Sequence, residues 1–207
     1  MVDDSEEDLG TLSELVTSDD QLGIEDLLMK YQPRLRRMAA ARLDSRLASR
    51  VDPSDVVQEA FIKAVQEMPG YVRDPAIPLY PWLRQLTTNR LAAAYQQHLH
   101  TQRRSVAREV RIKFGLSSAS ISLLADRLVS HERTPSGEIR QKEVEQQVRK
   151  ALDKLSLIDR EVLILRFIEQ LTTQEIATVL GIAAEAVGMR RLRALRRLSE
   201  ELEGLQE

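Results

Sequence analysis

The stretch that decides the fold is SLIDREVLILRFIEQLTTQEIATVLGIAAEAVGMRRLRALRRL, which runs from Ser156 to Leu198. Its middle section begins with Thr172, a favourable N-cap residue, and Glu175 follows three residues later. This spacing is typical of a capping box, and Gly181, just past the last apolar residue, is typical of a helix end. The pattern therefore predicts a short helix with a defined start and stop.

A second helical pattern begins near Ala184. One sector of its helical wheel is apolar and contains Val187, Leu192, Leu195, Leu198 and Leu202. The opposite sector contains Ala186, Met189, Arg190, Arg193 and Arg197. A short helix, a turn with glycine and a longer helix with a cationic outer face indicate a helix-turn-helix, whose second helix enters the DNA major groove. The alternative is an ordinary helical hairpin with arginines on a solvated face.

The residues before this pair favour the helix-turn-helix. A broad apolar face is formed by Leu152, Leu155, Ile158, Val162, Leu163, Leu165 and Phe167. We expect a supporting helix from Ser156 to Gln170 that buries the inner side of the pair.

Composition indicates an all-α chain. Its 207 residues suffice for two small domains, and 43% are apolar but only 4% aromatic, with no convincing alternating strand. The absence of cysteine excludes disulfides and thiolate metal sites. His98 and His100 are two residues apart and point in different directions on a helix, so we expect no metal site and no cofactor. With no apolar leader and no apolar run near twenty residues, we expect a cytoplasmic protein.

The charge is unevenly distributed along the chain. Residues 1–26 contain ten carboxylates and no Lys or Arg, and removing these ten negative charges from the total of −2 leaves +8. The sequence thus predicts a basic body with an acidic N-terminal arm over residues 1–21. The arm is interpreted either as a solvated, partly disordered tail or as a competitor of DNA for the basic surfaces.

The N-terminal half is predicted to contain three helices. The first spans Leu22 to Leu47, with a boundary or kink at Pro33. The second begins at Asp52-Pro53 and runs through Val56–Val65, ending before Pro69-Gly70. Residues 69–81 contain four prolines and are predicted to form a stiff loop, and Trp82 begins the third helix, which ends near His98.

Two motifs resemble a known family. The segment DVVQEAF from Asp55 to Phe61, followed by Pro81-Trp-Leu-Arg84 and Asn89-Arg90, resembles the second conserved region of bacterial sigma factors of the extracytoplasmic-function (ECF) group. The helix-turn-helix resembles the fourth region of that group. The resemblance implies a region-2-like domain at 22–100, a linker at 101–138 and a region-4-like domain at 139–207.

In that family, the helix matching Val56–Val65 docks on the coiled coil of the β′ subunit of RNA polymerase. The resemblance therefore implies that polymerase is bound by Asp55, Gln58 and Glu59. For Asp55, helix capping is a compatible alternative role.

The family's second region also opens and contacts the minus-ten promoter element. Unpaired bases need stacking faces and nearby cations. The residues of suitable type are Tyr71, Arg73, Tyr80, Trp82, Arg84, Asn89 and Arg90, and we expect Arg84, Asn89 and Arg90 on the outside of their helix. Trp82 has an alternative role in the core, because it begins an amphipathic helix.

The fourth region would contact the minus-35 element with the helix from Ala184. The implied contacts are Thr172, Ala186, Met189, Arg190, Arg193, Arg196 and Arg197. Gly188 stands where family members often carry Lys or Arg, which removes one expected DNA contact. Arg191 falls toward the apolar sector and is expected either to lay its stem along the core or to touch the neighbouring helix.

The resemblance predicts a sigma factor that binds core RNA polymerase, through its β′ and β subunits, and promoter DNA. An anti-sigma factor is a further candidate partner, and the linker is expected to thread polymerase channels. The alternative is a helix-turn-helix regulator that acts without joining polymerase. We expect no enzyme and no small-molecule substrate, because the sequence lacks a phosphate-binding glycine loop, a Ser/His/Asp arrangement and a metal constellation.

Overall fold

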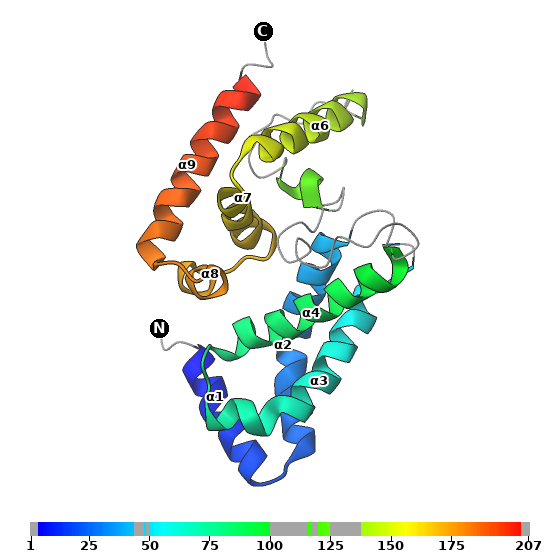
Figure 1. Ribbon diagram of the computed structural model, residues 1–207, viewed down its shortest axis with the longest axis vertical. Coiled ribbons are helices and arrows are strands. Elements are labelled where there is room, and N and C mark those ends of the chain that lie inside the picture. The colour runs from blue at the N-terminus through cyan, green and yellow to red at the C-terminus, as the bar shows by residue number, and fades with distance from the viewer. Residues whose placement is uncertain are drawn as a thin grey trace. The chain divides into compact units, whose positions relative to one another are not determined.

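A computed structural model of the protein describes residues 4–43, 48, 50–99, 116, 120–124 and 138–203. These residues form helices and turns with no strand among them, and the chain divides into two compact units, Met1–Phe114 and Gly115–Glu207 (Figure 1). The prediction of an all-α chain with two helical domains is confirmed. The division between the units falls inside the predicted linker.

Unit 1 contains α1 (Asp4–Thr17), α2 (Gln21–Arg42), α3 (Pro53–Arg73) and α4 (Leu79–Leu99). Helices α2, α3 and α4 pack on one another, and α1 contacts all three. Their apolar faces supply the core, which includes Leu35, Met38 and Leu83. At one end of this core, the buried hydroxyl of Tyr95 donates a hydrogen bond of 2.7 Å to the carbonyl oxygen of Arg42.

Two prolines lie inside helices where the sequence predicted boundaries. Helix α2 continues through Pro33, and α3 continues through Pro69 to Arg73. The predicted loop 69–81 is therefore wrong at both ends, since only residues 74–78 separate α3 from α4. Each proline removes one helical hydrogen bond. Both prolines are exposed, so water can satisfy the carbonyl group that loses its partner.

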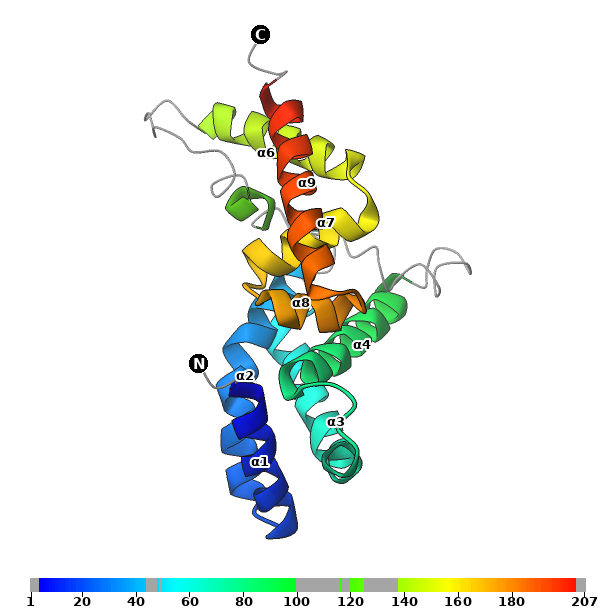
Figure 2. The ribbon, with the colours of Figure 1, turned by 90° about the vertical axis from the view of Figure 1, so that its left-hand side faces the viewer.

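The acidic N-terminus is a packed helix over residues 4–17, which corrects the interpretation of this segment as a solvated tail. Leu12 of α1 is fully buried. Asp8 accepts a hydrogen bond from the Tyr31 hydroxyl and lies 3.7 Å from the Lys30 ammonium of α2. Figure 2 shows α1 alongside α2. Apolar burial and this charged contact together hold the helix in place.

A close approach at Gly23 joins α1 to α2. A Cβ atom at Gly23 would lie only 2.4 Å from a Leu15 methyl group and 2.8 Å from a carboxylate oxygen of Asp20. The same Asp20 carboxylate caps α2 by accepting from the Gly23 amide at 3.0 Å. Glycine at this position therefore lets the two helices meet at a tight turn.

Unit 2 contains a helical turn at 120–124 and then α6 (Glu138–Lys154), α7 (Leu157–Leu163), η1 (Ile164–Ile168), α8 (Thr173–Leu180) and α9 (Ala184–Glu203). Helix α9 contacts α6, α7 and α8. The turn at 120–124 lies within the predicted linker, and its Ser122 hydroxyl bonds to Glu145 of α6. The path of the remaining linker lies outside the described residues, and so do His100 and His131.

The segment predicted as one supporting helix, from Ser156 to Gln170, consists of the α-helix α7 followed by the π-helical turn η1. Helix α7 changes at Ile164 into the single π-helical turn η1, in which the Glu169 amide bonds to the Ile164 carbonyl at 3.1 Å. Gln170 then has a φ of 60°, in the left-handed region, and α8 follows. The π-helical turn and the left-handed Gln170 end the helix and change the direction of the chain before α8, whereas an uninterrupted α-helix would continue straight.

None of the helices that the structure describes combines the length and apolar character needed to cross a membrane. Within the same residues, no group of three or more His, Asp or Glu side chains is arranged to hold a metal ion.

Candidate nucleic-acid interface

The first helix of the pair in unit 2 has the predicted ends. The Thr172 hydroxyl accepts from the Glu175 amide at 3.2 Å, and the Glu175 carboxylate accepts from the Thr172 amide at 2.8 Å. At the other end, Gly181 has a φ of 65° and the Ile182 amide bonds to the Ala177 carbonyl at 3.1 Å. The capping box and the left-handed glycine thus fix both ends of α8.

Helix α9 presents one face to solvent. Val187, Ala194 and Leu198 are buried against the rest of unit 2, while Met189 is 62% exposed. The other predicted contacts on the exposed side are Arg193, Arg196 and Arg197; Ala186 is half-buried. Leu192 was predicted to be apolar core but is 65% exposed, so that prediction is wrong. The buried side of α9 is formed by Val187, Ala194 and Leu198, and Leu192 falls outside this contact.

Arg190 differs from the other predicted arginines because it points to the interior. Its Nη1 atom lies 2.9 Å from Oδ1 of Asp159, whose side chain is only 3% exposed. Asp159 is on α7, and its own amide bonds to the Ser156 hydroxyl that caps this helix. Arg191, the next residue in the chain after Arg190, is half-buried. The predicted cationic face therefore contains one arginine whose partner is a buried carboxylate.

The pKa of Asp159 reflects this environment. Burial acts to raise the pKa, but hydrogen bonds from Ser156 and Arg190 and the charges of Arg190 and Arg193 outweigh it. The net pKa is below the ordinary value, so the carboxylate is ionised at neutral pH.

In unit 1, the first candidate surface is one face of α3. Asp55, Gln58 and Glu59 are all exposed, as their predicted contact role requires. The capping role considered for Asp55 belongs to Asp52, whose carboxylate accepts from the Ser54 amide at 2.7 Å. The same face exposes Ile62 and Val65, which the sequence interpretation did not include. Ile62 follows Glu59 by three residues and Gln58 by four, and Val65 follows Ile62 by three. This helical spacing is a signal that could have identified both residues.

The second candidate surface in unit 1 surrounds a pair of stacked aromatic rings. The ring centroids of Tyr71 and Trp82 are 4.2 Å apart, with the planes inclined by 16°. Trp82 is half-buried, so one part of its side chain packs in the core and another part remains accessible. Tyr71 is buried and its hydroxyl donates to the Ile77 carbonyl at 2.9 Å, and burial raises its pKa to about 12. Tyr71 thus holds the 74–78 loop and supports the Trp82 ring.

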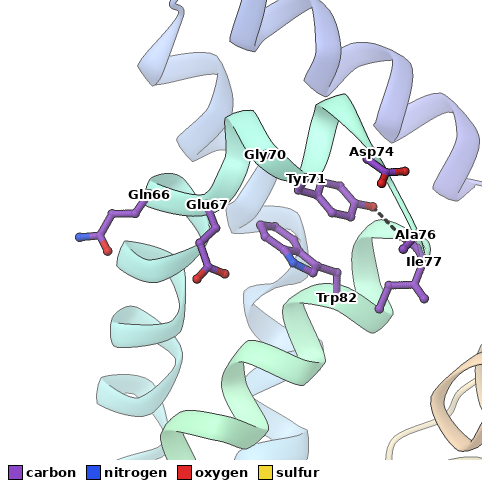
Figure 3. A pocket seen from close by; sticks show the side chains of 8 residues that line it. All are labelled: Gln66, Glu67, Gly70, Tyr71, Asp74, Ala76, Ile77 and Trp82. Carbon is purple, nitrogen blue, oxygen red and sulfur yellow. Dashed lines mark hydrogen bonds between the residues drawn. The ribbon is translucent and has the colours of Figure 1, made fainter.

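A cavity of about 430 Å³ lies beside these rings. Figure 3 shows the residues that line it, from the end of α3, the 74–78 loop and the start of α4. Its polar side chains are Gln66, Glu67 and Asp74. The cavity therefore combines an aromatic face with hydrogen-bond acceptors.

Other predicted contacts in unit 1 lie in the core. The Tyr80 ring is 1% exposed, its centroid lies 6.1 Å from that of Tyr31, and the Arg34 guanidinium lies 3.8 Å above it. Arg84 is buried as well, so the expectation that it lies on the outside of α4 is wrong. Both residues face the packed interior of the helical bundle. Arg73 and Asn89 are exposed and Arg90 is half-buried, and these three remain accessible.

Two family profiles match this arrangement. Sigma-70 region 2 matches residues 27–101, and Sigma-70, region 4 matches residues 145–198. The first match lies in unit 1 and the second in unit 2. The chain belongs to the sigma-70 family. The family resemblance predicted from the sequence is confirmed, and sigma factors are in general regulators rather than enzymes.

Similar proteins carry the same family description. The probable RNA polymerase sigma factor RfaY of Xanthomonas campestris is 30% identical over 148 residues, which is 72% of this chain but 33% of that protein. The chain therefore matches about a third of the length of this relative. The RNA polymerase sigma factor CnrH of Cupriavidus metallidurans is 29% identical over 153 residues, covering 73% of this chain and 74% of CnrH.

A solved structure has the same fold. The structure of CnrH in complex with the cytosolic domain of CnrY matches with a TM-score of 0.52 and 22% identity. The match covers 93% of this chain and 96% of the CnrH chain. At this identity, the likeness concerns the fold.

Proposed function

We propose that the protein is a sigma factor of the ECF group that joins core RNA polymerase and directs initiation at promoters. The observation that supports this function best is the combination, in one chain, of a helix-turn-helix unit with a second unit that exposes a mixed polar and apolar face on α3. A regulator that binds DNA alone has no need of the second surface. The protein would act in the cytoplasm with polymerase and DNA, and would catalyse no reaction of its own.

The α3 face is the proposed polymerase-binding surface. Ile62 is 61% exposed and lies one helical turn after the exposed Gln58 and Glu59. Val65, also exposed, extends the apolar portion of this face. Exposed apolar groups rimmed by polar ones mark protein-binding surfaces. The proposed partner is the coiled coil of the β′ subunit, with further contacts to the β subunit.

The exposed face of α9 is the proposed contact with the minus-35 element. Arg193 lies where a guanidinium can contact a base or a flanking phosphate. Arg196 lies 3.5 Å from Glu200 and is exposed, so phosphate can replace this weak surface pair. Thr172, at the start of α8, can donate its hydroxyl hydrogen to phosphate while its oxygen still caps the helix.

The cavity beside Trp82 is the proposed position of an unstacked base from the minus-ten element. Trp82 would offer a stacking face, and the carboxylates of Glu67 and Asp74 would accept from exocyclic amino groups, which cytosine and adenine carry. Arg73, Asn89 and Arg90 would contact the backbone around it. Tyr71 would act by supporting Trp82.

An anti-sigma factor is a proposed further partner. CnrH has been solved with the cytosolic domain of CnrY, and this chain has the CnrH fold over nearly its whole length. A regulator of that kind would restrain this protein by covering surfaces that polymerase needs.

The test is binding to purified core polymerase. The double variant Gln58→Ala with Glu59→Arg should abolish co-purification with core enzyme while leaving the helical circular dichroism signal intact. A matched control is Gln21→Ala with Glu25→Arg, which makes the same two changes at exposed positions of α2. Unaffected binding of the α3 variant, or equal loss in the control, would show that α3 is not the docking surface.

Transcription distinguishes the sigma factor from a regulator that acts alone. Core polymerase plus this protein should produce defined RNA starts on genomic DNA, and sequencing those starts would identify the promoter. Sequence-specific DNA binding without core polymerase, together with no initiation, would support the regulator instead.

A further inference from the structure

We propose that Asp159 and Arg190 form a positioning pair that fixes the rotation of α9, so that Arg190 supports base contacts made by its neighbours and makes none itself. The proposal rests on the proposed function, because it concerns how α9 meets promoter DNA. It removes Arg190 from the predicted DNA contacts and adds Asp159, a residue of α7 that faces away from DNA.

The geometry connects the two helices through one charged contact. Asp159 lies in the first turn of α7, where the Ser156 hydroxyl caps the helix. Its carboxylate accepts from Arg190 at 2.9 Å across the contact between α7 and α9. The Asp159 side chain is nearly inaccessible, whereas the Arg190 side chain is 31% exposed along its length. The pair is therefore anchored at the carboxylate end.

Solvation determines where the Arg190 guanidinium stays. A buried carboxylate that loses a charged partner is strongly disfavoured. Moving Arg190 to a phosphate would leave the buried, ionised Asp159 with only the Ser156 hydrogen bond and the charge of Arg193 to stabilise it. The arginines on the outer face of α9 are held less firmly. Arg193 and Arg197 are exposed, Arg193 acts on Asp159 through its charge, and Arg196 pairs with an exposed glutamate. Arg190 therefore stays with Asp159 when DNA binds.

The helical repeat converts this contact into an orientation. Successive residues are about 100° apart around an α-helix, so Met189 and Arg193 lie within roughly 40° of each other, and Arg190 lies about 100° away from Met189. Holding Arg190 against α7 directs the side of α9 that carries Met189 and Arg193 to solvent. Gly188, which has no side chain, adds no competing contact at this turn.

The experiment uses the full-length protein and the promoter that the wild type selects with core polymerase. The variants are Asp159→Asn, Arg190→Gln, the double variant and Arg190→Lys, with Arg193→Gln as the matched control on the exposed face. Promoter affinity is measured at several salt concentrations and with each base substituted in the minus-35 element. Circular dichroism checks that each variant is folded at the temperature used.

We expect Asp159→Asn and Arg190→Gln each to weaken promoter binding by roughly tenfold, and the double variant by no more than the worse single, because both remove one contact. Both should relax the base preference, and Arg190→Lys should recover part of it. The slope of log affinity against log salt should match the wild type for Arg190→Gln, since a lost phosphate contact would lower it by about 0.9.

Three results would overturn the proposal. One is a reduced salt slope for Arg190→Gln, which would make Arg190 a phosphate contact. Another is additivity of the two single changes. The third is a lower melting temperature with unchanged base preference in the folded variants, which would make the pair structural only. A wild type that selects no promoter would instead contradict the proposed function, so the two failures are distinguishable.

Discussion

The surface of unit 1 proposed for the minus-ten element and the outer face of α9 in unit 2 differ in how far their candidate residues are exposed. In unit 1, Tyr80 and Arg84 are buried, and Tyr71 supports Trp82 from within. In unit 2, Met189 and Arg193 are exposed on one helical face. A helix with neighbours on several sides buries residues that look suited to DNA, whereas α9 has an open face. Chemical type therefore predicts a contact well only where the packing leaves the residue accessible.

The largest effect that would test this comparison is expected at Tyr80. Replacing it with Ala should cost about 3–5 kcal/mol of unfolding free energy in unit 1, because a large buried ring under Arg34 is lost. Trp82 is the single tryptophan of the sequence, so its fluorescence during urea unfolding reports unit 1. Met189→Ala, at an exposed position of α9, is the control and should change stability by less than about 0.5 kcal/mol. Similar small losses for both would remove the contrast between the two regions.

The next effect concerns the open face itself. Arg193→Ala should cost roughly 1–3 kcal/mol of promoter-binding free energy if the guanidinium makes a bidentate base contact, and should relax the preference at one promoter position. Binding titrations against a set of single-base promoter variants measure both quantities. If binding to every promoter variant is weakened equally, Arg193 contacts a phosphate and not a base.

A smaller effect, on the stability of unit 2, is expected at the turn between α8 and α9, which lies outside the proposed DNA-contact surface. Gly181→Ala should cost about 1–2 kcal/mol, because alanine is strained at a φ of 65° although nothing crowds its Cβ atom. Thermal unfolding followed by circular dichroism measures the loss, and Gly181→Asn, which tolerates the left-handed region better, is the control. Equal losses in both variants would indicate that φ is not the cause.

The smallest effect is a dependence on pH. The folded-state pKa of Asp159 is below its ordinary value of 3.8, so its ionised form stabilises unit 2 above that pH. This stability should be lost as the pH falls through the lowered pKa. The difference in melting temperature between the wild type and Asp159→Asn should therefore shrink below about pH 4. A difference that stays constant down to pH 2 would show that protonation of Asp159 has no part in it.

Local patterns predicted the ends of α8 and the start of α9, because capping and glycine conformations depend on a few adjacent residues. The exposed polar residues of α3 were indicated by the family resemblance. Prolines were less informative, since Pro33 and Pro69 point to water and their helices continue through them. Exposure of a proline depends on tertiary packing and is absent from the local sequence.

Long-range contacts explain the remaining differences. Arg190 and Asp159 are 31 residues apart, and their pairing requires α7 and α9 to be packed. The acidic segment joins unit 1 because Leu12 finds a buried site and Asp8 finds Tyr31 and Lys30. Net charge over residues 1–26 gave no indication of either contact, because it averages over a helix that has one apolar side.

The π-helical turn at Ile164–Ile168 makes the length of this segment as important as its composition. Its hydrogen bonds span five residues, one more than in an α-helix. Deleting one residue here would allow regular α-helix to form and would turn everything that follows by about 100°. Substitutions in η1 would then be tolerated far better than deletions. Homologous chains should accordingly differ in the amino acids of this segment but have the same number of residues in it.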